Sequence, residues 1–195
     1  MNEFSIDTSR LTIRNLELTD LDDFHRYRSN REVTKYQGFD VMSLEQAAEF
    51  IKNNSTKRFG NAGEWVQYGI ESKANGKIVG DCAIKLDDPD IRIAEIGITI
   101  SHLEQQKGYA KEILQAILTF LFTSKQIHRV VETVDVENIA SINLLKSVGF
   151  RQEGHFIENT FFKGSWGSEF QYAMLKREWD SQYNNIHRVD TITDR

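Results

Sequence analysis

The chain has little of what several protein classes require. Its 195 residues include one cysteine, Cys82, which excludes an internal disulfide and fits a reducing compartment. No apolar run approaches the roughly 20 residues of a membrane-spanning helix, and the start MNEFSIDTSR lacks the basic and then apolar order of a signal peptide. The net charge of −5 shows no basic excess of the kind that nucleic-acid-binding domains carry. We therefore expect a cytoplasmic protein that binds neither membrane nor nucleic acid.

Motifs of several enzyme classes are missing as well. The chain contains no G-x-x-x-x-G-K-[ST] for a nucleoside triphosphate, no G-x-G-x-x-G for a dinucleotide and no G-x-S-x-G nucleophile turn. Its five histidines have no ligand spacing with one another or with Cys82, so we expect no metal site. Cys82 itself lies in an apolar segment and is expected to be packed rather than reactive.

What the chain does have is a clear order of elements. Alternating apolar residues predict strands, and apolar residues three and four positions apart predict helices. In the first half of the chain the patterns predict a strand over 10–18, a helix to about 28 capped by Thr19, and a helix after a Ser43–Gln46 capping box. Strands follow over 64–72, 77–86 and 93–101, with a hairpin turn at Asn75-Gly76. The second half is predicted to form a helix over 108–125, a strand over 128–136, a helix over 139–147 closed by Gly149, and strands over 150–162 and 169–179 around the turn KGSWGS.

This order predicts an α/β (α+β) domain over residues 1–180. Strands and helices that follow one another in this mixed order indicate a mixed sheet with helices on both faces. The remaining residues, 181–195, are expected to form a polar and mobile tail. The order of elements by itself implies no function.

The helix predicted from residue 108 begins with an unusual loop, EQQKGYA, at residues 104–110. The first N–H groups of a helix have no intrahelical partner, and the helix dipole favours negative charge there, so such a start can bind an anion. Gly108 would let a phosphate approach the backbone, and Ala110 would keep the first turn small. A tight turn into a helix uses the same residue types, so spacing alone leaves both interpretations open.

Two stretches resemble a known family. EIGITISHLEQQKGYAKEIL and VDVENIASINLLKSVGFRQEG look like the two central motifs of the GNAT acetyltransferase superfamily. The E-I-G strand and the ending N-x-x-S-x-x-L-L-x-x-x-G-F are similar to its RimJ/RimL-type branch, and the element order is similar from about residue 10 to residue 179. The resemblance implies a GNAT-like, mostly antiparallel central sheet and an N-acetyltransferase that uses acetyl-CoA.

The resemblance also implies a set of cofactor-binding residues. The family pattern Q/R-x-x-G-x-G/A is matched by Gln105, Gly108 and Ala110, whose loop amides would hold the pyrophosphate of coenzyme A. In this family the preceding strand has a bulge that separates it from its neighbour, and one N–H there polarises the thioester carbonyl. The implied cofactor residues are Ile98, Thr99, Ile100, Gln105, Gln106, Lys107, Gly108, Tyr109, Ala110, Asn138, Ser141 and Lys146. Asn138 could equally cap the following helix, and Ser141 and Lys146 could simply face solvent.

Glu95 is the candidate general base. Its side chain alternates with Ala94 and Ile96 and therefore points away from the face that they bury, and the resemblance implies that it acts through a water. The alternative is an ordinary polar residue on a half-exposed strand. Many family members carry a tyrosine, as the acid for the departing thiolate, where this chain has Leu145. No general acid can therefore be assigned, and the thiolate would leave toward solvent.

The acceptor is expected to be a primary amine. Deprotonating a lysine side chain of pKa near 10.4 costs about 4.6 kcal/mol at pH 7, whereas an α-amine of pKa near 7.8 costs about 1 kcal/mol. This cost and the branch favour direct transfer to a protein N-terminal α-amine, by a monomer or homodimer. A small-molecule acceptor (a polyamine, an aminoglycoside or an amino acid) is an alternative, and a non-catalytic acyl-CoA-binding module is another.

Overall fold

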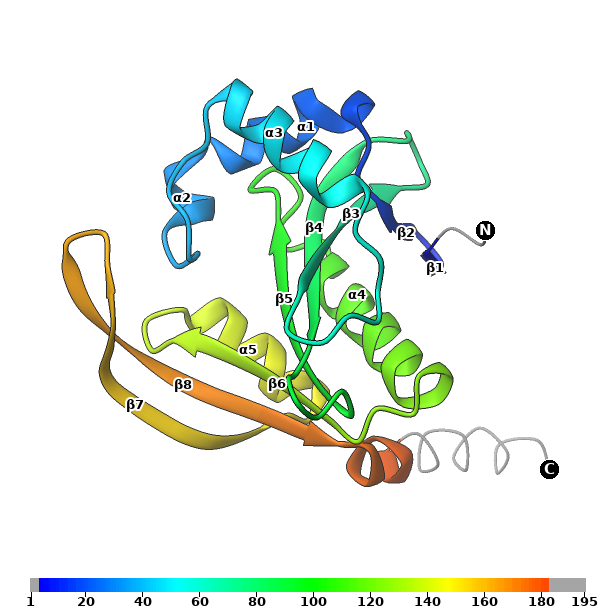
Figure 1. Ribbon diagram of the computed structural model, residues 1–195, viewed down its shortest axis with the longest axis vertical. Helices are drawn as coiled ribbons and strands as arrows, with labels where there is room; N and C mark the ends of the chain where they lie inside the picture. Colours follow the sequence, from blue (N-terminus) through cyan, green and yellow to red (C-terminus); the bar gives the residue numbers. More distant parts are fainter. Residues whose placement is uncertain (1–3, 183–195) are drawn as a thin grey trace.

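A single eight-stranded sheet organises the chain (Figure 1), in the order β1-β2-β3-β4-β5-β6-β8-β7. The computed structural model describes residues 4–182. The elements are β1 Ser5–Asp7, β2 Leu11–Asn15, α1 Leu21–Arg28, α2 Arg31–Thr34, α3 Leu44–Ser55, β3 Trp65–Ser72, β4 Ile78–Leu86, β5 Ile93–Ile100, α4 Tyr109–Thr119, β6 Arg129–Asp135, α5 Ile139–Val148, β7 Arg151–Phe162 and β8 Ser165–Leu175, followed by helical residues 176–182. Every strand pair is antiparallel except β5–β6. The predicted mixed, mostly antiparallel sheet is confirmed.

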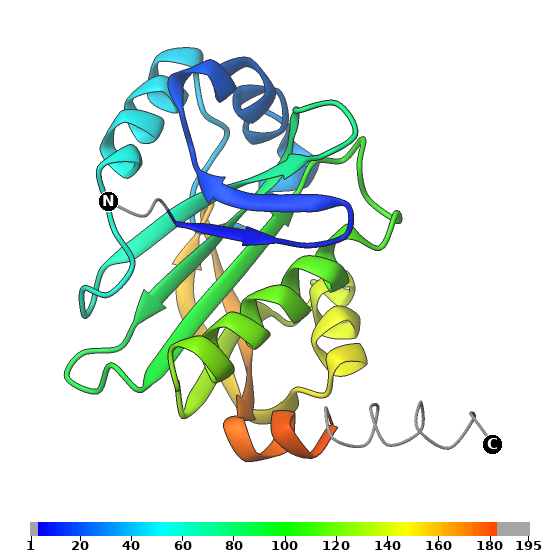
Figure 2. The same ribbon diagram turned by 90° about the vertical axis from the view of Figure 1, so that its right-hand side faces the viewer.

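Helices cover both faces of this sheet, as the sequence predicts. α4 and α5 lie together on one face (Figure 2), and α1–α3 gather over the other near β4. The buried side of α4 consists of Ile113, Leu114, Ile117 and Leu118, all 0% exposed, at the spacing expected for a helix. Burying each such side chain contributes roughly 1.5–3 kcal/mol. This packing fixes α4, and with it the loop that precedes it, against β5.

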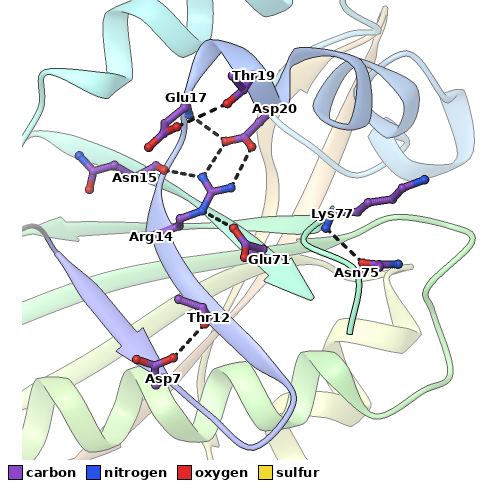
Figure 3. A network of polar contacts seen from close by, with 10 residues as sticks. All are labelled: Asp7, Thr12, Arg14, Asn15, Glu17, Thr19, Asp20, Glu71, Asn75 and Lys77. Carbon is purple, nitrogen blue, oxygen red and sulfur yellow. Dashed lines mark hydrogen bonds and ion pairs between the residues drawn. The ribbon is translucent and has the colours of Figure 1, made fainter. Parts of the chain in front are cut away.

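A polar network fixes the start of α1 on the sheet (Figure 3). The Arg14 guanidinium donates two hydrogen bonds to the Asp20 carboxylate, at 2.8 and 2.9 Å, and a third to Glu71 on β3 at 2.5 Å. Asp20 in turn accepts from the Glu17 backbone N–H at 2.8 Å, closing a short 3-10 turn over Leu18–Asp20. The prediction that Thr19 caps this helix is therefore wrong, because Glu17 caps the 3-10 turn and α1 begins at Leu21.

The far end of α1 is joined to the sheet by a buried ion pair. The Asp81 carboxylate on β4, 0% exposed, accepts hydrogen bonds from the Tyr27 hydroxyl at 2.5 Å and from Arg28 at 2.5 and 2.9 Å. Gln67 on β3 donates to the same carboxylate. Removing one partner of such a pair leaves a buried charge uncompensated. This buried ion pair therefore determines where α1, and the short α2 that follows it, lie above the sheet.

The last two strands form a long curved arm. Lys163 and Gly164 both have positive φ, 49° and 86°, which is the signature of a two-residue hairpin turn. The predicted turn KGSWGS is therefore too long, because β8 already begins at Ser165. The arm curls back toward α2 (Figure 1), where the Lys163 ammonium donates to the Thr34 carbonyl at 2.7 Å.

The ends of several elements differ from the prediction. β1 and α2, of three and four residues, were not predicted because a periodic pattern needs more residues to be visible. β8 ends at Leu175 rather than 179, because the Glu178 carboxylate accepts the Leu175 N–H at 2.8 Å and a helix follows. Of the predicted tail, residues 181 and 182 belong to that helix, and 183–195 lie outside the described residues.

Candidate functional site

A cavity of about 470 Å³ lies where β5 ends and α4 begins, with α2 and the start of α5 as its other walls. Ten of the twelve residues predicted to bind a cofactor line it: Ile98, Thr99, Ile100, Gln105, Gln106, Gly108, Tyr109, Ala110, Asn138 and Ser141. Lys107 and Lys146 do not line it. The Lys107 ammonium pairs with Glu104 at 2.7 Å, and Lys146 is exposed on α5.

The loop before α4 borders this cavity and ends in unpaired backbone N–H groups at the start of the helix. Gln106 and Gly108 have positive φ, 62° and 80°, and both line the cavity. Within residues 4–182, the N–H groups of residues 108–110 have no acceptor, whereas residues 102–106 form hydrogen-bonded turns. Gly108 is the N-cap of α4 and contributes no capping side chain. The loop therefore has the geometry of an anion site at a helix N-terminus.

Arg10 holds this loop in place from the β1–β2 turn, a support that the sequence did not reveal. Its guanidinium donates to the Lys107 carbonyl at 2.9 Å and to the Glu112 carboxylate on α4 at 2.7 Å, and it lies 4.7 Å from the centre of the Tyr109 ring. Burial alone would raise the pKa of Glu112, but hydrogen bonds from Thr8, Arg10 and Ser9 outweigh it and lower that pKa to about 2. The loop before α4 is thus attached to a fully ionised carboxylate.

The strand before the loop separates from β6 on the other side of the cavity. β5 and β6 pair in parallel only from Ile93 to Glu95, opposite Arg129 to Val131. From Ile96 to Ile100 the edge of β5 that faces β6 has no strand partner, so a fork opens between the two strands. The expected bulge is absent, because the β4–β5 register runs without a shift from Ala94 to Ile100.

Asn138 both caps α5 and lines the cavity. Its side-chain oxygen accepts the Ser141 N–H at 3.2 Å, which is the capping role left open by the sequence. Leu145, where the family's tyrosine is missing, is 0% exposed in the core beneath α5. This part of the cavity wall therefore carries no acidic O–H group from α5.

Glu95 lies outside the cavity, at the point where the fork begins. Its carboxylate pairs with the Lys85 ammonium on β4 at 2.5 Å, on the sheet face opposite α4. A smaller pocket on that face is bordered by Glu95, Arg129 and Gln171. Three residues along a strand span about 10 Å, so Glu95 is about that far from Ile98 in the cavity wall.

A second carboxylic acid at the fork was missed. Glu132 on β6 is 8% exposed, and its Oε2 has no hydrogen-bond partner among the described residues. Burial, and then the nearby charge of Glu95, raise its pKa to about 8. The signal is visible in RVVETVD, because Glu132 shares the buried face with Val130 and Val134. Also missed were Glu32, Val33, Tyr36, Gln37, Glu104, Lys111, Ala140 and Leu144, which line the cavity.

Two further expectations concern metals and membranes. Among residues 4–182, no group of three or more His, Cys, Asp or Glu side chains is arranged to hold a metal ion. No helix in the described part of the chain is long and apolar enough to cross a membrane. Cys82 is fully buried, as expected for a packed thiol, and burial raises its pKa.

Comparisons with known proteins agree with this geometry. The family model for the acetyltransferase (GNAT) domain matches residues 10–151. The uncharacterized N-acetyltransferase p20 of Bacillus licheniformis is 32% identical over 176 residues, 88% of this chain and 96% of that protein. A GNAT-family acetyltransferase from Bacillus anthracis superposes with a TM-score of 0.82 at 27% identity, covering 90% of this chain and 100% of that one.

A third relative was solved with ligands. The structure of spermidine N-acetyltransferase from Vibrio cholerae in complex with CoA and spermine superposes with a TM-score of 0.74 at 25% identity, covering 88% of this chain and 99% of that one. GNAT acetyltransferases take their acetyl group from acetyl-CoA, which agrees with an anion-binding loop beside an open strand fork. The chain belongs to the GNAT acetyltransferase family and is an acetyl-CoA-dependent N-acetyltransferase.

Proposed function

We propose that this enzyme binds acetyl-CoA in the cavity between β5 and α4 and transfers the acetyl group directly to a primary amine. The observation that carries the proposal is the set of unpaired N–H groups at residues 108–110, which border the same cavity as Ile98 to Ile100 on the open edge of β5. Acetyl-CoA supplies an activated acetyl group and a phosphate-rich anion, and the fork and the loop fit these two parts respectively.

The loop would bind the pyrophosphate through its backbone. The first N–H groups of α4 are unpaired, and the dipole of α4 adds roughly 0.3–2 kcal/mol of attraction for an anion. Lys111, one turn into the helix, also borders the cavity. Beyond the loop, Asn138 lines the cavity and would contact the pantetheine arm while it caps α5.

The fork would orient the thioester. The free edge of β5 over 96–100 offers backbone N–H groups to a ligand that lies along it, as a further strand would. An N–H aimed at the thioester oxygen stabilises the negative charge that develops there, and removing one such donor costs about 3 kcal/mol in other enzymes. Ile98 and Ile100 supply the apolar wall on this side.

Glu95 would accept the proton of the acceptor amine. Its carboxylate pairs with the Lys85 ammonium at 2.5 Å, which fixes its position on this face of the sheet. Because Glu95 lies outside the cavity, its distance from Ile98 fits proton transfer through a water rather than direct contact. The acceptor would approach from the sheet face that carries Glu95.

We propose a protein N-terminal α-amine as the acceptor, in a domain over residues 1–180 of the RimJ/RimL-type branch. The α-amine is the less costly nucleophile to deprotonate at pH 7. A polyamine is the second candidate, because Asp135 on β6 and Glu169 on β8 lie directly opposite each other on the face of Glu95. Like charges so placed repel unless a cation lies between them. The Vibrio cholerae relative was solved with spermine.

Release of free thiol from acetyl-CoA tests the proposal. Purified enzyme is assayed with peptides bearing free N-termini, with the same peptides blocked, and with spermidine, so that the preferred acceptor is identified. Glu95→Gln should lower turnover by about 10²-fold or more with little change in the Kd for acetyl-CoA. A protein that binds acetyl-CoA tightly but releases no thiol with any amine would instead be a binding module, and the proposal would be wrong.

A further inference from the structure

Glu132 lies at the point where β5 and β6 separate. The last β5–β6 pair joins Glu95 to Val131, so Glu132 is the first β6 residue after the two strands separate. Its side chain lies between Val130 and Val134 on the buried face, opposite the side from which Glu95 projects. Two carboxyl groups therefore flank the start of the fork, one on each face of the sheet.

The surroundings of these two groups differ sharply. Glu95 is partly exposed and pairs with Lys85, whereas Glu132 is buried without an ion-pair or hydrogen-bond partner among residues 4–182. Opposite Glu132 on β8 lies Tyr172, whose hydroxyl donates to Gln152 instead, at 3.3 Å. The buried residues of α4 and α5 over this face are apolar. A buried carboxyl with no compensating group is held in its neutral, protonated form.

A proton donor would help the sulfur to leave, and α5 does not supply one. The departing sulfur of coenzyme A has a thiol pKa near that of cysteine, about 8.5, so its thiolate is basic enough to accept a proton at pH 7. Leu145 on α5 has no ionisable group. Glu132 is a carboxylic acid on the neighbouring β6, on the face that α5 covers.

Resting on the proposed function, we propose that Glu132, which lies at the start of the fork and does not itself line the cavity, gives a proton through water to the sulfur of coenzyme A as the acetyl group leaves. The amine nitrogen forms a bond to the thioester carbon and the carbon–sulfur bond breaks, with its electron pair going to sulfur. Glu95 takes the proton that the nitrogen loses, and Glu132 becomes a carboxylate. Transfer of one proton from Glu95 to Glu132, through water, restores both groups.

The electrostatic coupling between the two residues favours this order. The negative charge of Glu95 raises the pKa of Glu132, after the larger effect of burial, to about 8. Once Glu95 has taken the amine proton, that charge is gone and the pKa of Glu132 falls. Glu132 therefore becomes the stronger acid at the step in which the thiolate is leaving. Pairs of titratable groups held at different pKa values are the usual arrangement for an acid and a base.

The test compares Glu132→Gln with wild type and with Glu137→Gln, an exposed control two residues after the end of β6. We expect Glu132→Gln to lower kcat by about 10²-fold, with KM and the Kd for acetyl-CoA within about twofold. Wild-type kcat should decline above pH 8 as Glu132 ionises, and this decline should be absent in Glu132→Gln. The control should match wild type in both respects. The proposal would be overturned if Glu132→Gln kept the kcat of the wild type and showed the same decline at alkaline pH.

Two readouts separate this role from a structural one. Glutamine also fits a buried polar site, so the melting temperature of Glu132→Gln should equal or exceed that of wild type. If the variant does not fold, carbon-13 NMR of the wild-type carboxyl decides the question, because a carboxyl that is ionised at pH 7 overturns the proposal and a neutral one supports it. Failure of the wild type to acetylate any amine would count against the proposed function, whereas an active wild type with an ionised Glu132 counts only against this inference.

Discussion

Single carboxylates in this enzyme differ in pKa because their neighbours differ. Glu112 accepts hydrogen bonds from Thr8, Ser9 and Arg10, at 2.6 to 3.1 Å, and its pKa falls to about 2 despite partial burial. Glu132 accepts none, and its pKa rises to about 8. Sequence alone cannot separate these cases, because the donors to Glu112 lie about a hundred positions away in the chain.

The lowered pKa of Glu112 predicts a specific pH dependence of stability. A carboxyl whose pKa is lower in the folded state stabilises the fold fully above its unfolded pKa, 4.5, and loses that contribution as the pH falls toward 2. We expect Glu112→Gln to lower the free energy of unfolding by about 2–3 kcal/mol at pH 7 and by much less at pH 3. Urea unfolding at both pH values measures the difference.

A matched control is Glu104→Gln, which removes the exposed ion pair to Lys107. Such surface pairs contribute about 0–1 kcal/mol, so this variant should unfold close to wild type at pH 7. Equal destabilisation of Glu112→Gln at pH 7 and pH 3 would show that packing, rather than the charge, is what Glu112 contributes.

At the scale of elements, the local pattern of apolar and capping residues predicted the helices and strands, but it did not predict where neighbouring strands pair and where they separate. The apolar spacing of α4 and the capping box of α3 are properties of adjacent residues, and both are present as predicted. The separation of β5 from β6 depends on two segments more than 30 residues apart, and the expected bulge is absent from β5. Pairing between segments so far apart in the chain does not change the apolar periodicity of either strand and cannot be predicted from it.

Adding one methyl group at Gly108 tests whether the loop before α4 binds the phosphates of coenzyme A. Gly108 has a φ of 80°, which costs a residue with a Cβ roughly 1–2 kcal/mol, and an added Cβ would lie 3.5 Å from Arg10 Nη2. We expect Gly108→Ala to weaken binding of coenzyme A about tenfold or more, measured by calorimetry, because the strain shifts the N–H groups at the start of α4. Gly76→Ala is the control: its φ is 69° and its Cβ would meet nothing within 4 Å. Equal affinities in the two variants would exclude the loop as the phosphate site.

At the scale of the whole molecule, the sequence predicted the fold class and most of the cavity wall, yet not the part of the wall formed by α2. The Asp81–Arg28 ion pair and the arm together place α2, and both are contacts between segments distant in the chain. Residues such as Val33 and Tyr36 therefore border the cavity through tertiary packing, with no motif of their own.

The contact between the arm and α2 predicts an effect on the acceptor rather than on the cofactor. The Lys163 ammonium joins the arm's tip to the Thr34 carbonyl, beside the sheet face that carries Glu95. Lys163→Met keeps the aliphatic stem but removes this hydrogen bond, which contributes about 1.5–3 kcal/mol when one partner is charged. We expect KM for the acceptor to rise about 3- to 10-fold, with the Kd for coenzyme A unchanged. Lys176→Met, which breaks an ion pair to Asp180 at the arm's base, should leave both constants near wild type, and an equal rise in KM there would show that the arm's tip has no special role.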